Sequence, residues 1–232
     1  MSYPVIENPV TGERAFRRHA PTDGSPLVAD LYARPGAAVV GEHVHPHASE
    51  TFTVVRGTLG VRVDGVESHA VPGTRVAVPP GTPHDWWTVG DETAFVIVEV
   101  DPGHRFEAMI RNLFGLAADG RTDSTGRPGL LQAALLAREF DDTIRFTSPP
   151  RAVQRPLFAA LAPIARLRGL RGWYEKYEQH TGAAVEELET IPPEIAALLP
   201  ALVGHDRADD PTPRARPWST PLAAQQVRLT AS

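Results

Sequence analysis

Histidine and carboxylate side chains gather in two short segments of this chain. The first segment is His43-Val44-His45-Pro46-His47-Ala48-Ser49-Glu50, and the second is Pro79-Pro80-Gly81-Thr82-Pro83-His84. Imidazole nitrogen and carboxylate oxygen are the protein ligands that zinc, iron, manganese, nickel and copper accept. Both segments lie among β-forming runs, where alternate side chains point to one face, so His43 and His45 can reach the same point in space. The spacing therefore indicates a site for one divalent transition metal ion.

Two pairs of histidines compete in the first segment. If His43 and His45 act together, four residues separate the pair from Glu50. If His45 and His47 act together, only two residues separate the pair from Glu50. The shorter connection leaves less room to bring the carboxylate back, so the first pair is preferred. His47 follows Pro46 and is expected to be a turn residue that faces solvent, with contact to a substrate as the minority alternative.

The composition limits the class of protein. The chain has 232 residues, of which 42% are hydrophobic and 22% are charged, as is ordinary for a soluble globular protein. Its net charge of −5 argues against nucleic acid or an anionic membrane as the main partner. The chain contains no cysteine, so thiolate metal sites are excluded. Because no apolar run approaches the ~20 residues that span a bilayer and no signal-peptide pattern is visible, we expect a cytoplasmic protein without integral membrane association.

Residues 1 to about 102 are predicted to form β structure. Short runs rich in Val, Thr and Phe are bounded by Gly, Pro and Asp, and Asp64-Gly65 is a strong signal for a two-residue hairpin turn. Many short strands at regular spacing are typical of a sandwich or barrel. The predicted strands are Leu27–Tyr32, Ala38–Val44, Thr51–Val55, Leu59–Val63, Arg75–Val78, Asp85–Val89 and Ala94–Val100.

The periodicity changes after residue 103. An apolar stripe at helical spacing runs from Phe106 to Phe114. Further helices are predicted over Leu130–Phe140, over Pro156–Leu170 with an interruption or kink at Pro163, and over Ile195–Val203. Strands first and helices afterwards indicate an α+β fold that is mainly β. We therefore expect a β-barrel with an N-terminal arm over residues 1–102, a helical extension over 103–203 packed on the barrel or on a partner, and a flexible tail over 204–232.

Two motifs carry a resemblance to a known family. The segment PGAAVVGEHVHPHASETFTVVRG resembles the first motif of the cupin family, in which His-x-His is followed by Glu and then Gly. The segment GTRVAVPPGTPHDWWT resembles its second motif, Gly-x5-Pro-x-Gly-x2-His-x3-Asn, except that Thr88 stands where Asn is usual. Gly36 is also one residue further from His43 than the family spacing. The match covers roughly residues 25 to 100.

The resemblance implies a single antiparallel barrel of the jelly-roll type with a metal inside. Its implied ligands are His43, His45, Glu50 and His84. Three imidazoles and one carboxylate leave up to two positions of an octahedron open, which is typical of a catalytic site and not of a closed structural one. The ion expected is Fe, Mn, Ni, Zn or Cu, with Fe²⁺ favoured. Barrels that resemble cupins commonly pair, so we also expect a homodimer.

The parity of the strands predicts which side chains surround the metal. Phe52 and Val54 lie two and four residues after Glu50, and Trp86 lies two residues after His84, so each points to the same face of its strand as the ligand. These three side chains are therefore expected to line an apolar pocket for a small-molecule substrate. The resemblance implies a dioxygenase of a small apolar or aromatic substrate, in which the protonation of Glu50 matters most. The first alternative is a non-redox lyase, isomerase or cyclase that uses Zn²⁺ or Mn²⁺ as Lewis acid, with His47 or a metal-bound hydroxide as base. The second is a non-enzymatic module that binds a small molecule.

Overall fold

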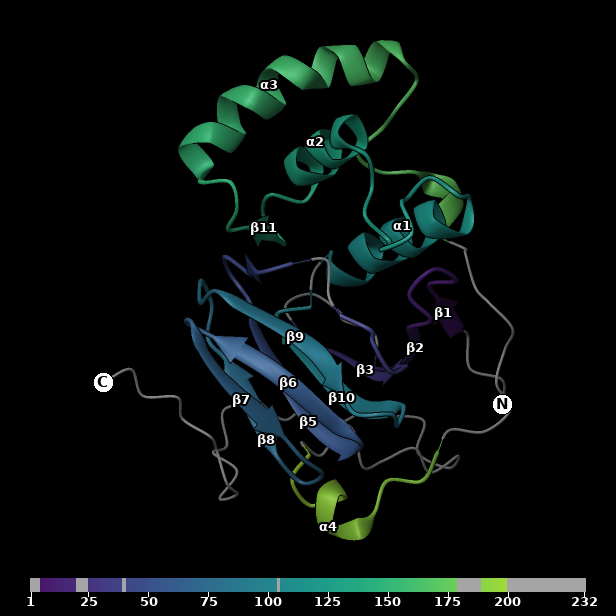
Figure 1. The fold of residues 1–232 in the computed structure, drawn as a ribbon, viewed down its shortest axis with the longest axis vertical. Coiled ribbons are helices and arrows are strands. Elements are labelled where there is room, and N and C mark those ends of the chain that lie inside the picture. The colour runs from purple at the N-terminus through teal and green to yellow at the C-terminus, as the bar shows by residue number, and fades with distance from the viewer. Residues whose placement is uncertain (1–4, 20–24, 39–40, 104, 179–188, 200–232) are drawn as a thin grey trace.

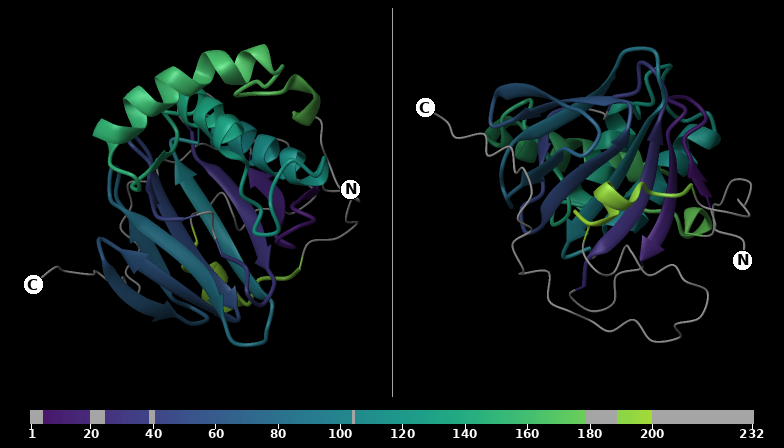
Figure 2. Two further views of the ribbon diagram at one scale, coloured as in Figure 1. Left: turned by 45° about the horizontal axis from the view of Figure 1, so that its top comes forward. Right: turned by 90° about the horizontal axis from the view of Figure 1, so that it is seen from below.

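The computed structural model describes residues 5–19, 25–38, 41–103, 105–178 and 189–199. Two antiparallel sheets face one another, helices α1, α2 and α3 lie together over one end of them, and α4 lies toward the other end (Figures 1 and 2). The predicted α+β class with a single, mainly antiparallel β-domain is confirmed. The tail expected over residues 204–232 lies outside the described residues.

The larger sheet has six strands and the smaller has five. In spatial order the larger sheet consists of β1 (Val5–Glu7), β2 (Arg14–His19), β3 (Leu27–Ala33), β10 (Ala94–Asp101), β5 (Ser49–Arg56) and β8 (Arg75–Val78). The smaller sheet consists of β11 (Arg145–Phe146), β4 (His43–Val44), β9 (His84–Val89), β6 (Thr58–Val63) and β7 (Val66–Ala70). The predicted hairpin joins β6 to β7, with Asp64 at φ 50° and Gly65 at φ 77°. Positive φ at both positions matches the right-handed twist of the flanking strands.

The core between the sheets follows from alternation along the strands. In β9, His84, Trp86 and Thr88 are buried and the residues between them are partly exposed. Phe52 and Val54 of β5 pack against residues of the opposite sheet in the same core. The other face of the larger sheet is also covered, because Ile195 packs on Val28, Phe95 and Ile97. Glu50, which lies two residues before Phe52 on β5, therefore points to the space between the sheets.

Four strands are absent from the predicted list: β7, which was implied only by the Asp64-Gly65 hairpin signal, and β1, β2 and β11. β2 has the sequence Arg-Ala-Phe-Arg-Arg-His, which lacks the apolar alternation that marks a strand. It is held by pairing with β3, and β1 pairs with β2 in turn. β11 lies in the helical half and pairs with β4 at the edge of the smaller sheet. The prediction for Ala38–Val44 was wrong in part, because β4 contains only His43 and Val44, and residues 39–40 lie outside the described residues.

The helical half differs from its prediction mainly at the ends of helices. Helix α3 begins at Arg151, after Pro150, and runs through Pro163 without interruption. The last predicted helix is short and begins earlier, since α4 contains four residues. The elements are α1 (Phe106–Ala118), α2 (Leu130–Glu139), α3 (Arg151–Leu167), the 3-10 turn η1 (Glu175–Tyr177) and α4 (Pro193–Ala196). Within the described ranges, we find no helix with the length and apolar character needed to cross a membrane.

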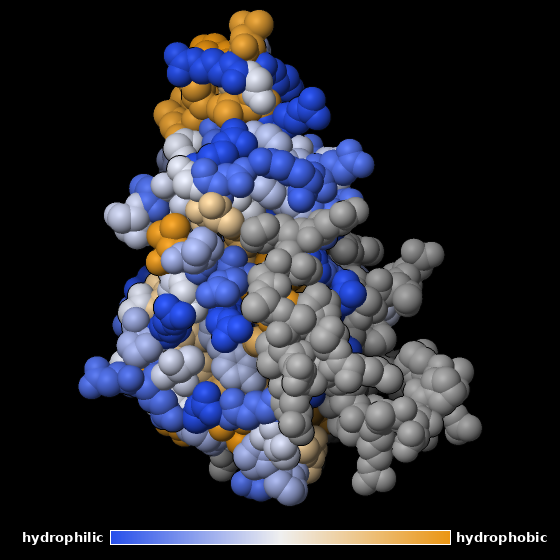
Figure 3. Space-filling model, turned by 90° about the vertical axis from the view of Figure 1, so that its right-hand side faces the viewer, coloured by the Kyte–Doolittle hydropathy of each residue, from blue (hydrophilic) through white to orange (hydrophobic). Residues whose placement is uncertain are grey.

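Helix α1 packs closely against η1, whereas one side of α3 faces solvent. Gly115 of α1 lies against the ring of Tyr177, and a Cβ atom at this position would lie 2.3 Å from its Cδ1 atom. Helix α3 packs on α2 through Ala162 and Ala165. Its outward side chains include Ile164 and Leu167, the latter 89% exposed, and Figure 3 shows this apolar surface at the top of the molecule. The helical layer is therefore attached to the β-domain mainly through α1 and β11.

Candidate metal centre

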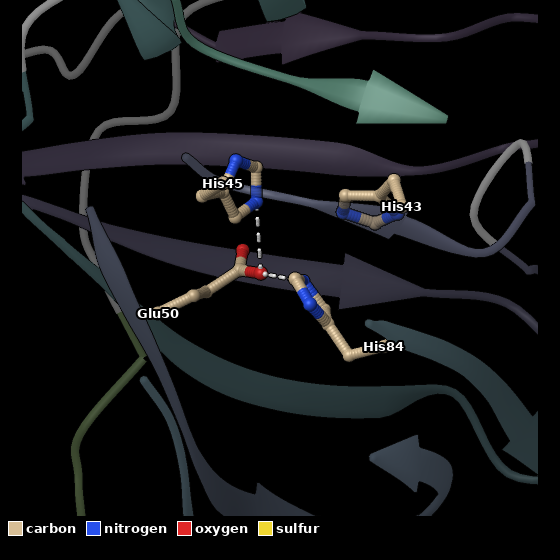
Figure 4. Close-up of side chains that lie close together, drawn as sticks. All are labelled: His43, His45, Glu50 and His84. Carbon is tan, nitrogen blue, oxygen red and sulfur yellow. Dashed lines mark hydrogen bonds and ion pairs between the residues drawn. The ribbon is translucent and has the colours of Figure 1, made fainter. Parts of the chain in front are cut away.

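Three strand segments bring two carboxylate oxygens and three imidazoles together. His43 and His84 are paired directly across β4 and β9. His45 follows the end of β4, and Glu50 is the second residue of β5. Each of these four side chains offers one ligand atom, and the four atoms lie within 4.8 Å of one another (Figure 4). We call this group the four-ligand cluster: His43, His45, Glu50 and His84.

A tight turn places the two motifs side by side. Gly81, which has φ 76°, donates its backbone N–H to the carbonyl oxygen of His45 over 2.8 Å. This φ lies in the left-handed region that glycine adopts without a steric penalty. The turn leads directly into β9, whose first residue is His84. The Pro-Gly-Thr-Pro segment of the second motif therefore positions His84 against the segment that carries His43 and His45.

The ring orientation of all three histidines is set by backbone carbonyl groups. The Nδ1 atom of His43 lies 2.9 Å from the carbonyl oxygen of Gly41, and that of His84 lies 2.9 Å from the oxygen of Thr82. The Nδ1 atom of His45 lies 2.8 Å from the oxygen of Thr143. Because a carbonyl can only accept, each Nδ1 must carry the proton and donate it. The Nε2 atoms are thereby left to face the centre of the cluster, as in metal-binding histidines.

The cluster is buried and electrically coupled. The four ligands are between 1 and 4% exposed. Burial opposes the charged form of Glu50, yet the neighbouring imidazoles of His45 and His84 hold the pKa of Glu50 below its usual range. Burial, together with the adjacent His84 and His45, lowers the pKa of His43 to about 3. Burial would lower the pKa of His84, but its hydrogen bond to Glu50 outweighs this and raises it. The cluster thus favours neutral His43 beside an ionised carboxylate.

The donor atoms fit a divalent transition metal ion. Glu50 Oε2 lies 2.9 Å from His84 Nε2 and 3.3 Å from His45 Nε2. His45 Nε2 is buried, and apart from this contact with Glu50 it has no hydrogen-bond partner among the described residues. Buried polar atoms are rarely left without a partner, because the lost hydration is costly. Nitrogen and carboxylate oxygen atoms converging around such an atom are the ligand set that first-row metals accept.

An apolar cavity extends from the cluster. His43 and Glu50 lie at its wall, and the rest of that wall comes from both sheets and from α1, with side chains such as Leu31, Val98 and Met109. Of the predicted pocket residues, Phe52 and Trp86 line this cavity. Val54 lies one inward position further along β5 and is fully buried in the core between the sheets, outside the cavity wall.

His47 lies apart from the cluster. It follows Pro46 in a bend and is exposed. It is neither a member of the four-ligand cluster nor part of the cavity wall. Its position is therefore that of the solvent-facing turn histidine, because the chain reverses direction between His45 and Glu50 and turns this side chain outward.

Sequence reasoning missed the contribution of distant segments to the site. Phe106 of α1 places its ring 5.3 Å from that of His45, and Ile144 lines the cavity beside Thr143. Asn8 and Glu13 line the same cavity from the turn between β1 and β2. The apolar stripe of α1 was the only available signal, and it did not show which surface the helix covers. A charged residue in a polar segment, such as Glu13, is ordinarily read as exposed.

Comparison with known proteins finds similarity in the β-domain. Residues 32–101 match the model of the cupin domain. A similar solved structure is an uncharacterized conserved protein with a double-stranded β-helix domain from Klebsiella pneumoniae, at 29% identity over 37% of this chain and 70% of that chain, with a TM-score of 0.34. KdgF from Halomonas sp. is similar at 17% identity over 40% and 83% of the two chains, with a TM-score of 0.36. The Streptomyces nucleoside dehydratase Pac13 is similar at 18% identity over 46% and 80%, with a TM-score of 0.37. No curated protein matches the chain.

Proposed function

We propose that this chain is a metal-dependent enzyme acting on a small apolar or aromatic substrate, because residues 32–101 match the cupin domain and the chain buries three histidines and one glutamate beside an apolar cavity. The observation that carries the proposal is the convergence of the cluster on the cavity. His43 and Glu50 belong to both, so a molecule in the cavity lies next to the ligand atoms. A closed structural site would have no such access.

The residues of the chain have separable tasks in this proposal. The three imidazoles and Glu50 hold the ion, and the carbonyl groups of residues 41, 82 and 143 keep the rings turned toward it. Phe52 and Trp86 exclude water and shape the cavity. When bound, a ferrous ion would supply Lewis acidity and one-electron chemistry with dioxygen.

We favour an oxygenase over a non-redox enzyme. The cavity wall is dominated by apolar side chains, which suits a substrate that has few polar groups for acid–base chemistry. The non-redox alternative uses His47 or a metal-bound hydroxide as base, and the exposed position of His47 outside the cavity counts against the first of these two bases. Fe²⁺ is the ion we propose.

The ligand set is tested by metal analysis. Wild-type protein and the His84→Ala variant are purified in parallel, loaded with Fe²⁺ under anaerobic conditions, and their bound iron is measured by elemental analysis. His69→Ala is the matched control, because His69 is exposed on β7. We expect one ion per chain in the wild type and the control, and a loss of most of the iron in His84→Ala. Equal iron in all three would contradict the ligand assignment.

The reaction class is tested with dioxygen. Iron-loaded protein is mixed with a panel of aromatic and flavonoid-like compounds, and oxygen uptake is followed with an electrode. We expect compound-dependent uptake that is lost in His84→Ala. Each compound that is consumed is then assayed without oxygen. Equal turnover under anaerobic conditions would rule out the oxygenase and leave the non-redox enzyme, whereas binding without turnover in both atmospheres would leave a binding module.

The assembly and the location belong to the same proposal. We propose a cytoplasmic homodimer, in keeping with the family resemblance. Light scattering coupled to size-exclusion chromatography measures the mass in solution directly, and a mass near 25.1 kDa, that of one chain, would contradict the dimer.

A further inference from the structure

A group of polar residues lies in the cavity wall away from the four-ligand cluster. The cavity reaches the turn between β1 and β2, where Asn8, Thr11 and Glu13 line it. We call these three residues the turn subsite. Two strands, β3 and β10, lie between β2 and the strand that carries Glu50. The wall between them is mostly apolar, with Ala15, Ala29 and Val98, and its charged residues Arg17 and Glu107 are paired with each other. The cavity therefore has two polar regions joined by an apolar surface.

The carboxyl group of Glu13 faces this cavity. Glu13 shares parity with Ala15 and Arg17, which also line the cavity, whereas the intervening Phe16 packs against Tyr32 outside it. Glu13 is only 6% exposed. Its Oε2 atom accepts a hydrogen bond from the hydroxyl of Thr11 over 2.8 Å, and among the described residues no other side chain bonds to the carboxyl group. One oxygen is therefore free to meet a ligand.

The buried position of the Glu13 carboxyl group favours its protonated form. Burial raises the pKa of Glu13 to about 7, although the Thr11 hydrogen bond partly opposes this. The other titratable and charged groups in the cavity wall are Arg17, Glu107, His43 and Glu50. Arg17 and Glu107 are paired with each other, with Arg17 Nη1 2.9 Å from Glu107 Oε2, and the other two belong to the four-ligand cluster. Among the described residues of the cavity wall, no cation is thus paired with the Glu13 carboxyl group, and its neutral form can donate an O–H.

We propose that Glu13 donates a hydrogen bond to a carbonyl or hydroxyl oxygen of the bound molecule. The ligand class is then an apolar, aryl or alkyl body with a hydrogen-bond acceptor on the part that lies away from the cluster. A buried donor without a partner discriminates strongly against a molecule that lacks the acceptor. As a statement about the substrate, the inference rests on the proposed function. As a statement about binding, it can be tested without the metal.

The test compares two molecules that differ in one group. Acetophenone and α-methylstyrene have the same shape, but the first carries C=O where the second carries C=CH₂. Their dissociation constants are measured at pH 6 by ligand-observed NMR titration, and the preference is the ratio of the two constants. We expect Glu13→Leu to reduce the preference for the ketone by about fivefold to tenfold, the effect of one buried hydrogen bond. Glu13→Gln should keep most of it, because the amide still donates.

The matched control is Glu7→Gln. Glu7 lies on β1 next to the same turn, but it pairs with Arg14 and does not line the cavity. Its variant should keep the wild-type preference. An equal preference in wild type and Glu13→Leu, or a wild type that does not bind the ketone, would overturn the inference. If Glu13→Leu does not fold, wild type is compared at pH 6 and pH 9, where ionised Glu13 can no longer donate. A preference unchanged at pH 9 would then overturn it.

Failure of this inference and failure of the proposed function give different results. Glu13 is not a ligand, so Glu13→Leu should bind iron as the wild type does. His84→Ala should lose iron and keep the preference for acetophenone. If His84→Ala keeps its iron while Glu13→Leu loses the preference for acetophenone, the result supports the turn subsite and contradicts the assignment of the metal ligands.

Discussion

The Nδ1 atom of His45 donates a hydrogen bond to the carbonyl oxygen of Thr143, which lies 2.8 Å away and 98 residues later in the chain. Thr143 belongs to the connection between α2 and β11, so the helical half orients a ring of the four-ligand cluster. Carbonyl groups that hold the outer nitrogen of a metal-binding histidine contribute tenfold to hundredfold in metal affinity. The helical half is therefore a structural support of the site and not only a cover for the barrel.

Loosening this support should weaken metal binding. Ile144 follows Thr143, is buried and packs against the core of the helical half. Ile144→Ala should allow the Thr143 carbonyl to move and reduce the affinity for Fe²⁺ or Zn²⁺ about tenfold. Competition with a chelator of known affinity measures this, and Ile164→Ala on the exposed side of α3 is the control. An unchanged affinity in folded Ile144→Ala would show that the hydrogen bond is dispensable.

Removing the metal should lower thermal stability. A ligand that binds only the folded state stabilises it, by about 2.7 kcal/mol when its free concentration is a hundred times the dissociation constant. Wild-type protein should therefore melt at a lower temperature after dialysis against a chelator and recover when Zn²⁺ is added. His84→Ala should show neither change in differential scanning calorimetry. If the Tm of the wild-type protein is the same with and without the metal, the proposed metal site is contradicted.

The ion pair of Arg18 and Asp30 should be important for the stability of the larger sheet. Asp30 is fully buried on β3, and Arg18 Nη2 of the neighbouring β2 lies 2.7 Å from its Oδ2. Asp30→Ala leaves a guanidinium group in a buried position, at a cost of about 3–5 kcal/mol. Urea denaturation should show this loss. Glu67→Ala, which removes the partner of Arg62 on the surface, should leave the unfolding midpoint unchanged.

Stability should also depend on pH through Glu13. Its pKa is about 7 in the folded chain and ordinarily 4.5, so below pH 4.5 both states are protonated and Glu13 has no effect. Between pH 4.5 and 7 the Glu13 carboxyl group is ionised in the unfolded chain but still protonated in the folded chain. The free energy of unfolding therefore decreases as the pH rises through this range. At ~1.4 kcal/mol per pH unit, this removes about 3 kcal/mol by pH 7.

The Glu13→Gln variant isolates this effect. Glu99 is also buried, and burial raises its pKa to about 7. The pH dependence of the stability of the wild type alone would therefore combine the effects of Glu13 and Glu99. The difference in unfolding free energy between Glu13→Gln and wild type should increase from pH 4.5 to pH 7 and stay constant above it. A difference that is independent of pH in urea titrations would show that Glu13 ionises normally.

The features that could be predicted from the amino-acid sequence are those that depend on residues close together in the chain. The ligand types of the cluster lie in two short motifs, and period-2 alternation along β-strands is enough to put His43 and His45 on one side. The Asp64-Gly65 hairpin and the stripe of α1 follow from backbone preference and from helical spacing. Each of these depends on residues a few positions apart, and the mainly β fold class follows from many such signals.

The segments that surround the four-ligand cluster from distant parts of the chain became visible only in the folded structure. β2 has no apolar alternation, and its place in the sheet depends on pairing with β3, which the pattern of one strand does not encode. Without β1 and β2, the turn that carries Glu13 cannot be assigned to the cavity. The bond from His45 to Thr143 joins two halves of the chain whose sequences are unrelated in pattern. Burial of Glu13 reverses what its residue type implies, because burial is a property of the packed chain, whereas the exposure of His47 agrees with the turn position expected from the sequence.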